Sequence, residues 1–252
     1  MSGKILEVRR LRKTFDGAPV LKDISFSVDR GEVIVIVGPS GCGKSTLLRC
    51  INGLERADGG EILLNGNRIN TDAKDMYLTR RRIGMVFQSY ELFSHLDVMG
   101  NLLLGPVKAL RSDADRVRAE ASTLLKRVGL EGRENALPRT LSGGQKQRIA
   151  LVRAMLMHPE LLLLDEITAA LDPEMVHEVL NVVFDLAADG MTMLIVTHEM
   201  RFAEAVADRI LFLDEGLVAE ESAPEIFFHG AKTARAQSFL QGFDFEARRL
   251  KS

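Results

Sequence analysis

The sequence predicts an α/β protein with a parallel sheet, and three apolar runs of strand length support this fold class. The runs are Val33 to Val37, Leu161 to Leu164 and Met191 to Val196. Short, continuous runs of this kind are typical of strands that helices bury on both faces. Polar residues follow each run, so the expected sheet has a polar edge at the carboxyl ends of its strands.

The chain around the first run is expected to form short antiparallel strands. Three residue pairs that favour tight turns separate these strands: Asp16-Gly17, Gly59-Gly60 and Asn65-Gly66. Residues 45–52 have helical spacing, and Gly53 ends the helix expected there. The N-terminal part is therefore predicted to combine an antiparallel β subdomain with the first strand and helix of the parallel core.

The middle of the chain has helical periodicity instead. Ser112 begins an expected helix that Gly129 ends, and its apolar residues fall on one face: Val117, Ala121, Leu124, Leu125 and Val128. Ser142 is a suitable cap for a second helix, which runs towards Pro159. This stretch is therefore predicted to be a helical subdomain inserted into the α/β core.

The α/β pattern resumes after the helical stretch. Asp172-Pro173 is a cap and first-turn pair, and the helix expected to follow it ends at Gly190 and has one apolar face: Val176, Val179, Leu180, Val183 and Phe184. We expect a single domain with these parts: residues 1–88 and 159–229 as the α/β core with its β subdomain, 89–158 as the inserted helical subdomain, and 230–252 as a C-terminal extension without a motif.

Composition limits the classes of function. The chain has 252 residues, 46% of them hydrophobic, which is enough for one large core. Its 33 basic and 35 acidic residues nearly cancel, so a nucleic-acid partner is not expected. Cys42 and Cys50, the two cysteines, fit neither a zinc site nor a disulfide framework. There is no apolar signal core and no run of about 18 apolar residues, so any membrane span is expected to come from another chain.

The loop after Val37 predicts a nucleotide triphosphate site. Residues 38–45 read Gly-Pro-Ser-Gly-Cys-Gly-Lys-Ser, a complete P-loop between an expected strand and an expected helix. Its glycines allow backbone N–H groups to point at phosphate oxygens. Lys44 adds a positive charge for the β- and γ-phosphates, and the Ser45 hydroxyl suits Mg²⁺. The core is therefore predicted to be that of a P-loop NTPase.

Polar residues after other strands supply the remaining chemistry. Asp165 is placed to hold Mg²⁺, and Glu166 to orient or deprotonate the attacking water. We expect His198 to contact the γ-phosphate and the water, and Gln88 to reach Mg²⁺ or the water. Because all follow strands, they should converge with Lys44 at one sheet edge. A solvated acidic turn and a structural histidine are the plain alternatives.

A second glycine-rich turn, Leu141-Ser142-Gly143-Gly144-Gln145, also precedes an expected helix. Its backbone N–H groups and the positive end of the helix dipole would form another anion site. The P-loop already holds one nucleotide, so this turn makes sense if two chains pack head to tail and complete each other's pockets. The alternative is an ordinary helix cap.

Other features have plainer interpretations. We expect Arg80-Arg81-Arg82 to be a solvated stretch, with a phosphate or lipid contact as the alternative. Cys42 is interpreted as a space-filling residue within the P-loop. Tyr90, Leu92 and Phe93 suit either the core or an exposed patch that docks a partner.

Taken in order, the motifs resemble those of the ATPase subunit of ABC transporters from about Ile5 to Leu240. The matching motifs are Walker A at 38–45, Gln88, Leu-Ser-Gly-Gly-Gln at 141–145, Walker B at 161–166, Ala-Leu-Asp at 170–172 and His198. The resemblance implies a homodimer that encloses two ATP molecules and whose closure and hydrolysis drive two membrane permease subunits.

The resemblance also implies a set of site residues. Within the family pattern, Phe15 matches the aromatic that stacks on adenine, Val20 lies against the base, and Asp172 belongs to a loop that faces the opposite protomer. The implied nucleotide-binding residues are Phe15, Val20, Gly38, Pro39, Ser40, Gly41, Cys42, Gly43, Lys44, Ser45, Thr46, Ser142, Gly143, Gly144, Gln145 and Asp172. The implied Mg²⁺ ligands are Ser45, Gln88 and Asp165, and the implied catalytic residues are Lys44, Gln88, Glu166 and His198.

Shorter segments are similar to the subfamily that imports polar amino acids: Met85 to Gln88, Glu91 to Phe93, Gly105 to Val107, and Thr197 to Ala203. That similarity implies a peripheral protein at the cytoplasmic face of the cell membrane, served indirectly by an extracytoplasmic solute-binding protein. The alternatives are a regulatory or cell-division scaffold and a motor for another small solute.

The sequence departs from the family pattern at four positions. Ile167 stands where Pro is usual and Ala169 where Ser is usual, which affects expectations of rate or of communication across the dimer. Ser94 and Gly100 replace a frequent Pro and Glu in the segment where a permease would dock.

Overall fold

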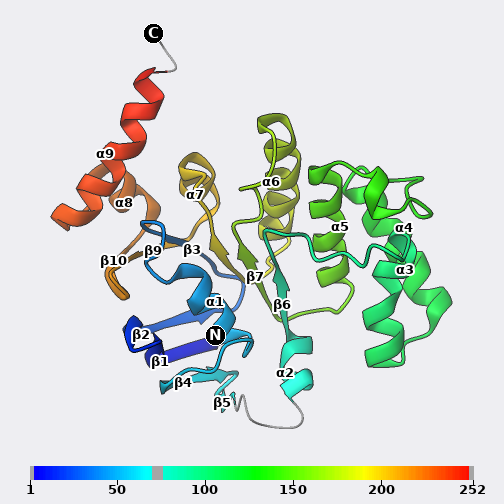
Figure 1. Ribbon diagram of the computed structural model, residues 1–252, viewed down its shortest axis with the longest axis horizontal. Helices are drawn as coiled ribbons and strands as arrows, with labels where there is room; N and C mark the ends of the chain where they lie inside the picture. The colour runs from blue at the N-terminus through cyan, green and yellow to red at the C-terminus, as the bar shows by residue number, and fades with distance from the viewer. Residues whose placement is uncertain (1–2, 70–75, 250–252) are drawn as a thin grey trace. The chain divides into compact units, whose positions relative to one another are not determined.

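The computed structural model describes residues 3–69 and 76–249. The chain divides into two compact units, and Figure 1 shows the elements of each. The first unit comprises residues up to Arg80 and from Gly190 onward, and the second comprises Arg81–Asp189. The fold class is α/β, with an antiparallel β subdomain, parallel strands and an inserted helical part, as the sequence predicts.

An antiparallel sheet forms the N-terminal part of the first unit. Its strands lie in the order β2-β1-β4-β5, with β1 at Lys4–Phe15, β2 at Ala18–Asp29, β4 at Gly59–Leu64 and β5 at Asn67–Arg68. Asp16 and Gly17 connect β1 to β2 with φ of 49° and 82°, and Asn65 and Gly66 connect β4 to β5 with φ of 49° and 75°. Both pairs are left-handed hairpin turns, as the sequence predicts.

The Gly59-Gly60 pair was predicted to be a turn between strands, and that prediction is wrong. Both residues belong to β4, and Gly60 has a φ of 82° where the pairing of β4 with β1 is irregular. A Cβ on Gly60 would lie 2.3 Å from the carbonyl oxygen of Arg10. The glycine is therefore needed because another strand's backbone approaches closely.

The first unit also contains parallel strands. Strand β3 (Val33–Val37) pairs in parallel with β8 (Met193–Val196) on one side and with β9 (Arg209–Asp214) on the other. Strand β10 (Leu217–Ser222) is antiparallel to β9. Every residue of β3 and β8 is buried. These are two of the three apolar runs from which the parallel sheet was predicted.

In the part of the chain that the structure describes, these strands are accompanied in the sequence by α1 (Lys44–Ile51), α2 (Met76–Arg82), α7 (Met200–Val206), α8 (Pro224–Gly230) and α9 (Ala234–Arg249). At the end of α1, the Arg80 guanidinium donates to the carbonyl oxygens of Asn52 and Gly53 at 3.3 and 2.7 Å. Arg82 pairs with Glu160 at 2.5 Å in the second unit. Arg80 and Arg81 are exposed and the Arg82 side chain is 39% exposed, in agreement with the predicted solvated stretch, although Arg80 and Arg82 also have specific partners.

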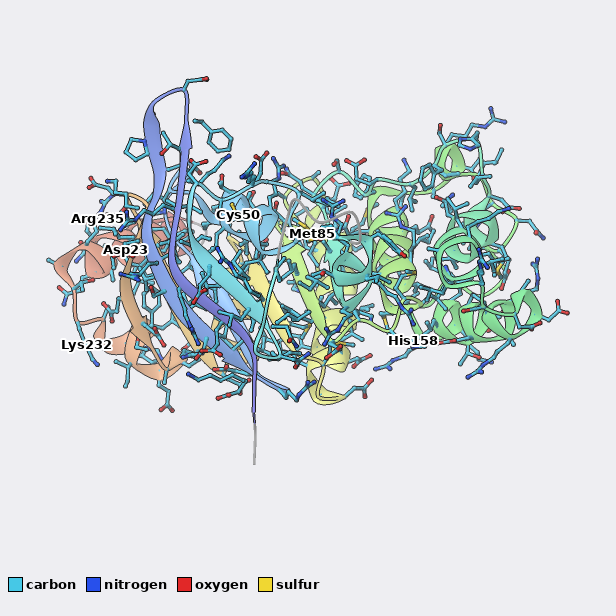
Figure 2. The ribbon with its side chains drawn as sticks, turned by 90° about the horizontal axis from the view of Figure 1, so that it is seen from below. Asp23, Cys50, Met85, His158, Lys232 and Arg235 are labelled. Carbon is cyan, nitrogen blue, oxygen red and sulfur yellow. The ribbon has the colours of Figure 1, made fainter. Side chains whose placement is uncertain are left out.

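The C-terminal extension is helical, and buried contacts hold its start. The Glu220 carboxylate accepts hydrogen bonds from the N–H groups of Lys232 and Thr233, and Lys232 and Arg235 mark this end of α9 in Figure 2. Burial alone would raise the pKa of Glu220, but these hydrogen bonds outweigh burial and lower it. The rings of Phe212 and Phe239, tilted by 44° with centroids 5.1 Å apart, add an apolar contact with the sheet.

The second unit has two parallel strands and most of the helices. Strand β6 (Ile83–Val86) pairs with β7 (Leu161–Asp165). The helices are α3 (Val98–Leu103), a π-helical turn η1 (Leu104–Ala109), α4 (Ala114–Arg127), a 3₁₀ turn η2 (Pro138–Thr140), α5 (Gly143–Met155) and α6 (Pro173–Ala188). Each regular element within residues 89–158 is helical, as expected for the insertion.

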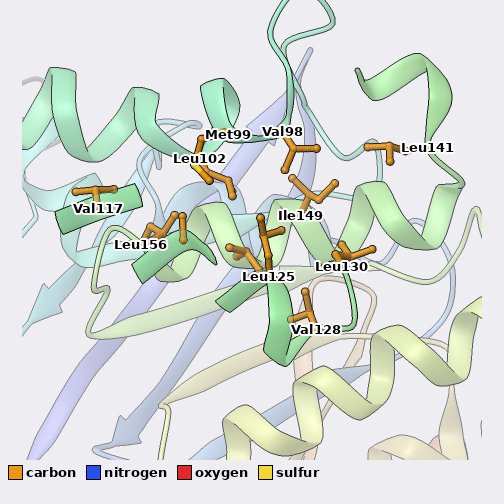
Figure 3. Close-up of a cluster of buried hydrophobic side chains, with 12 residues drawn as sticks. Val98, Met99, Leu102, Val117, Leu125, Val128, Leu130, Leu141, Ile149 and Leu156 are labelled. Atoms are coloured by element: carbon orange, nitrogen blue, oxygen red, sulfur yellow. The ribbon is translucent and has the colours of Figure 1, made fainter. Parts of the chain in front are cut away.

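The helices of the second unit enclose one apolar cluster (Figure 3): Val98, Met99, Leu102, Val117, Ala121, Leu125, Val128, Leu130, Leu141, Ile149, Val152 and Leu156. It contains four residues of the predicted apolar face of α4, and the fifth, Leu124, packs partly buried against it. Helix α4 begins at Ala114, two residues later than expected. Asp113, not Ser112, is its cap, because the Asp113 carboxylate accepts from the Arg116 N–H at 2.9 Å.

Among the described residues, none of the helices combines the length and the apolar character that a membrane span requires.

Candidate nucleotide-binding site

The P-loop connects β3 to α1 through a backbone that requires glycine. Gly38, Gly41 and Gly43 have φ of 151°, 79° and 104°, which L-residues rarely adopt. A Cβ on Gly38 would lie 2.0 Å from the carbonyl oxygen of Leu213 at the end of β9. A Cβ on Gly43 would lie 3.0 Å from the carbonyl oxygen of Val20. The loop is therefore packed between β9 and β2, and Val20, a predicted base contact, lies beside it.

Lys44 is folded over the loop. Its side chain is 4% exposed, and the Nζ atom donates to the carbonyl oxygens of Gly38 and Pro39 at 2.9 and 3.0 Å. A phosphate oxygen could replace these neutral acceptors and form a stronger, charge-assisted bond. Helix α1 has Gly43 at its N-cap and no side-chain cap, so no side chain competes with an anion for its first N–H groups. Ser45 and Thr46 lie in this first turn.

The two cysteines are free and buried. Burial raises the pKa of the Cys42 thiol and raises that of Cys50, on α1 (Figure 2), to about 12. Both thiols are therefore protonated near neutral pH and are poor nucleophiles. These properties agree with the space-filling interpretation of Cys42.

An exposed aromatic ring lies at the end of β1. Phe15 is 40% exposed although it is large and apolar. The Lys13 ammonium lies over the ring, 4.6 Å from its centroid. An exposed ring of this kind suits stacking on a nucleotide base, the role that the sequence predicts for Phe15.

The structure brings His198 to the same sheet edge as the P-loop. Ile36 of β3 is paired with Val196 of β8, and the strands are parallel. Gly38 and His198 each lie two residues beyond this pair, so both leave the sheet at the same level. The His198 side chain is exposed, and the next turn begins with a bond from the Glu199 N–H to the Thr197 hydroxyl.

The second unit brings Gln88, Asp165 and Glu166 together in the same way. Val86 of β6 is paired with Leu164 of β7, so Gln88 and Glu166 both lie two residues beyond the pair. Asp165 is 5% exposed, Glu166 is half-buried with a φ of 47°, and Gln88 is exposed. The convergence of this set with the P-loop and His198 on one nucleotide stays a prediction.

The predicted Mg²⁺ ligands match the chemistry of that ion. Ser45, Gln88 and Asp165 offer a hydroxyl, an amide oxygen and one carboxylate, and Mg²⁺ prefers oxygen. Within residues 3–69 and 76–249, no group of three or more His, Cys, Asp or Glu side chains could hold a metal by itself. A donor set with a single carboxylate suits an ion that phosphate oxygens help to hold.

The second glycine-rich turn is capped within its own chain. Ser142 caps α5: its Oγ accepts from the Gln145 N–H at 3.2 Å, and the Gln145 side chain accepts from the Ser142 N–H at 3.0 Å. The Gly144 N–H contacts the Met175 sulfur at 3.4 Å. Three of the N–H groups predicted to bind an anion, those of Ser142, Gly144 and Gln145, therefore already have internal partners.

The turn and the Asp172 loop are packed against each other. A Cβ on Gly143 would lie 2.9 Å from a methyl carbon of Leu171, and a Cβ on Gly144 would lie 2.9 Å from the Met175 Cβ. Asp172 is exposed and is the N-cap of α6, but its side chain makes no capping bond. Its carboxylate is thus available to a group outside this helix.

Sequence reasoning missed Asn101, which organises the chain after Gln88. Asn101 is fully buried, and its amide group exchanges two hydrogen bonds with the backbone of Phe93, at 2.8 and 3.1 Å, and donates to Leu96 and Asp97. The available signal was a single asparagine among the apolar residues of α3, but the sequence did not indicate which groups Asn101 would bond to. Of the residues expected to belong either to the core or to an exposed patch, Leu92 packs on the apolar cluster and Phe93 is 45% exposed. Leu92 therefore belongs to the core and Phe93 to the surface.

The departures from the family pattern have local explanations in two cases. Asp97 caps α3 by accepting from the Gly100 N–H at 2.6 Å. A glutamate at position 100 could return a bond to the cap, and glycine cannot. Ile167, directly after Glu166, is 5% exposed and is therefore a buried apolar residue. Nothing in the structure explains Ala169.

A P-loop after a buried parallel strand defines a nucleotide-binding protein of the α/β class. The family model described as ABC transporter matches residues 21–169. The glutamine transport ATP-binding protein of Bacillus subtilis is 48% identical over 94% of this chain and 98% of its own length. The glutamate/aspartate import ATP-binding protein of Escherichia coli K12 matches with the same three values.

A solved structure has the same fold. The ATP-binding cassette MJ0796, in a dimeric post-hydrolysis state bound to ADP and Pi, is 32% identical with a TM-score of 0.79. The match covers 87% of this chain and 98% of that one. The chain therefore belongs to the ABC transporter family, and it is an ATPase.

Proposed function

We propose that this chain is the ATP-binding and ATP-hydrolysing subunit of an ABC importer for polar amino acids. The observation that carries the proposal is the match of 94% of the chain, at 48% identity, to transport subunits named for glutamine and for glutamate/aspartate. The P-loop geometry supports it, because three left-handed glycines and a buried lysine surround the uncapped start of α1.

The working form in this proposal is a homodimer with two ATP molecules between the chains. Each P-loop would bind the phosphates of one ATP, and the Leu141–Gln145 turn and Asp172 of the other chain would close over them. The dimeric state of the MJ0796 cassette supports this arrangement. The internal packing of Gly143 and Gly144 on the Asp172 loop supports it further, because both parts would approach the partner as one surface.

The proposed roles follow from the chemistry of each group. Lys44 would exchange the Gly38 and Pro39 carbonyl oxygens for phosphate oxygens. Mg²⁺, held by Ser45, Gln88 and Asp165, would neutralise the charge of the phosphates. Glu166 would take a proton from the attacking water, and His198 would orient that water against the γ-phosphate.

The remaining nucleotide contacts follow the predicted set. Phe15 would stack on the adenine with Val20 at its edge, and the loop residues Pro39, Ser40, Gly41, Cys42, Gly43 and Thr46 would surround the phosphates. An exposed ring and a loop free of side-chain caps are the features that support this placement.

The transported solute would be selected elsewhere. The two relatives share the same 48% identity with this chain but are named for different solutes. Two permease subunits would therefore provide selectivity together with an extracytoplasmic solute-binding protein, and this chain would lie at the cytoplasmic face of the membrane. Purification from detergent-solubilised membranes should recover two permease subunits with it; recovery of a cell-division complex instead would favour the scaffold alternative.

Two variants test the chemistry together. Glu166→Gln should keep ATP affinity but slow hydrolysis by about 100-fold or more, since the general base is lost, and should accumulate as an ATP-bound dimer. Lys44→Ala should instead weaken ATP binding, measured by calorimetry. Hydrolysis by Glu166→Gln at the wild-type rate, or unchanged affinity in Lys44→Ala, would contradict the assigned roles.

A further inference from the structure

We propose that Gln147 and Arg153 are positioning residues that fasten the loop carrying Gln88 to helix α5, so that Gln88 and the Leu141–Gln145 turn at the start of α5 move as one piece. The inference rests on the proposed function, because only there do Gln88 and this turn act on nucleotide.

Gln147 holds the loop on the side before Gln88. Its side chain is fully buried, and its Nε2 donates to the carbonyl oxygen of Phe87 at 3.2 Å. The Oε1 atom is also buried and has no hydrogen-bond partner in the described part of the chain. Burying an amide with one end unsatisfied is unfavourable compared with burying leucine. The bond to Phe87 is therefore the structural reason for a glutamine at this position.

Arg153 holds the loop on the side after Gln88. Its guanidinium donates to the carbonyl oxygens of Glu91 at 2.6 Å and Tyr90 at 3.3 Å. The fork of N–H groups suits two consecutive carbonyls, and a lysine could satisfy only one well. Burial lowers the pKa of Arg153, but an arginine remains charged at neutral pH.

The backbone at these two carbonyls is strained. Tyr90 and Glu91 have φ of 61° and 50°, and neither is a glycine. Two consecutive residues in this region persist only where surrounding contacts hold them. Arg153 supplies such contacts, so its loss should let residues 88–91 relax to ordinary conformations.

The loop also touches the start of α5. A Cβ on Gly143 would lie 2.9 Å from the Tyr90 hydroxyl oxygen. The loop therefore contacts α5 at its first residue, at Gln147 and at Arg153 near its last turn. Because the loop is held at three positions along α5, it cannot move unless the helix moves too. A shift of Gln88 on binding Mg²⁺ or water would thus move the turn that is offered to the partner copy.

Hydrogen exchange tests whether Gln147 and Arg153 hold the loop on α5, an arrangement called the clamp below, without relying on ATP hydrolysis. In the nucleotide-free full-length chain, Arg153→Met should raise amide exchange in residues 88–92 by about tenfold or more. Arg153→Lys should restore part of the protection, and Gln147→Leu should affect mainly the residues next to Phe87. Arg118→Met, at an exposed arginine on α4, is the matched control. Unchanged exchange in the loop, or increased exchange throughout the second unit, would overturn the proposal.

A second measurement separates positioning from folding. Arg153→Met should raise the Mg²⁺ concentration for half-maximal ATPase activity by about fivefold while ATP affinity, which depends on the P-loop, stays constant. An equal loss of activity at every Mg²⁺ concentration would point to a structural role and overturn the inference. If Glu166→Gln had already contradicted the proposed function, the exchange result would still decide whether the clamp exists.

Discussion

The two glycine-rich turns look alike in sequence but use glycine for different reasons. In the P-loop, Gly38, Gly41 and Gly43 adopt left-handed φ values, and no side chain caps the helix that follows. In the Leu141–Gln145 turn, neither glycine has a positive φ, and Ser142 and Gln145 cap the helix reciprocally. Here glycine is required by crowding alone, since Cβ atoms would meet neighbouring side chains at 2.9 Å, whereas at Gly38 and Gly43 crowding adds to the left-handed φ.

The difference suggests that the two turns bind phosphate in different ways. The P-loop is built to surround an anion by itself, with its backbone preset and its lysine already inside. The second turn is complete without a ligand, so an anion would have to compete with internal partners or use the N–H groups that remain. In the proposed dimer, this arrangement would make the contact with the partner's nucleotide weaker and easier to release.

The largest effect is expected for Gly38→Ala. The new Cβ would meet a backbone oxygen that cannot move aside, and φ would be strained as well. We expect the free energy of unfolding, measured in urea, to fall by about 3 kcal/mol. Gly41→Ala is the control, because it has the left-handed φ but open space, and it should lose only about 1 kcal/mol. Equal losses would contradict the steric part of the comparison.

An intermediate effect is expected for Gly144→Ala. Alanine favours the helix, but its Cβ would lie 2.9 Å from the Met175 Cβ, which is fixed to the backbone of α6. A net loss of about 1 to 2 kcal/mol in urea unfolding should result. In Gly143→Ala the contacts are the ends of the Leu171 and Tyr90 side chains, which can move, so the loss should be smaller. The reverse order would show that crowding is not the reason for glycine.

The smallest effect is expected for Ser142→Ala. This change removes the side-chain cap of α5 and should cost about 1 kcal/mol of unfolding free energy. Ser142→Thr keeps the hydroxyl and should retain most of the stability. If Ser142→Ala were as stable as the wild type, the capping box would not be what closes this turn in the isolated chain.

Local patterns were enough to predict much of the fold and the backbone conformation of the P-loop. Apolar runs indicated the buried strands, and the pairs Asp16-Gly17 and Asn65-Gly66 indicated turns. The order of strand, glycine-rich loop and helix indicated the P-loop. Each of these depends on residues close together in the chain, whose conformational preferences are strong. The prediction of a turn at Gly59-Gly60 was wrong because Gly60 is required by the backbone of Arg10, which lies about fifty residues away in the chain.

Roles that depend on distant partners could not be predicted. Arg80 bonds to carbonyls at the end of α1, and Arg153 to a loop about sixty residues earlier. Even the nearby partners of Asn101, in the loop before it, are backbone groups. Carbonyl oxygens are present at every residue, so no sequence pattern indicates which one an arginine or asparagine will reach.

The sequence by itself determined the P-loop of this protein, because its buried strand, its glycines with positive φ and the helix that follows depend on residues close together in the chain. Only the tertiary structure decided which glycines serve conformation and which serve packing, and which side chains of α5 hydrogen-bond to the loop that carries Gln88. The physical reason is that packing and long-range hydrogen bonds depend on where the folded chain places its backbone, and residue identity alone does not specify that placement.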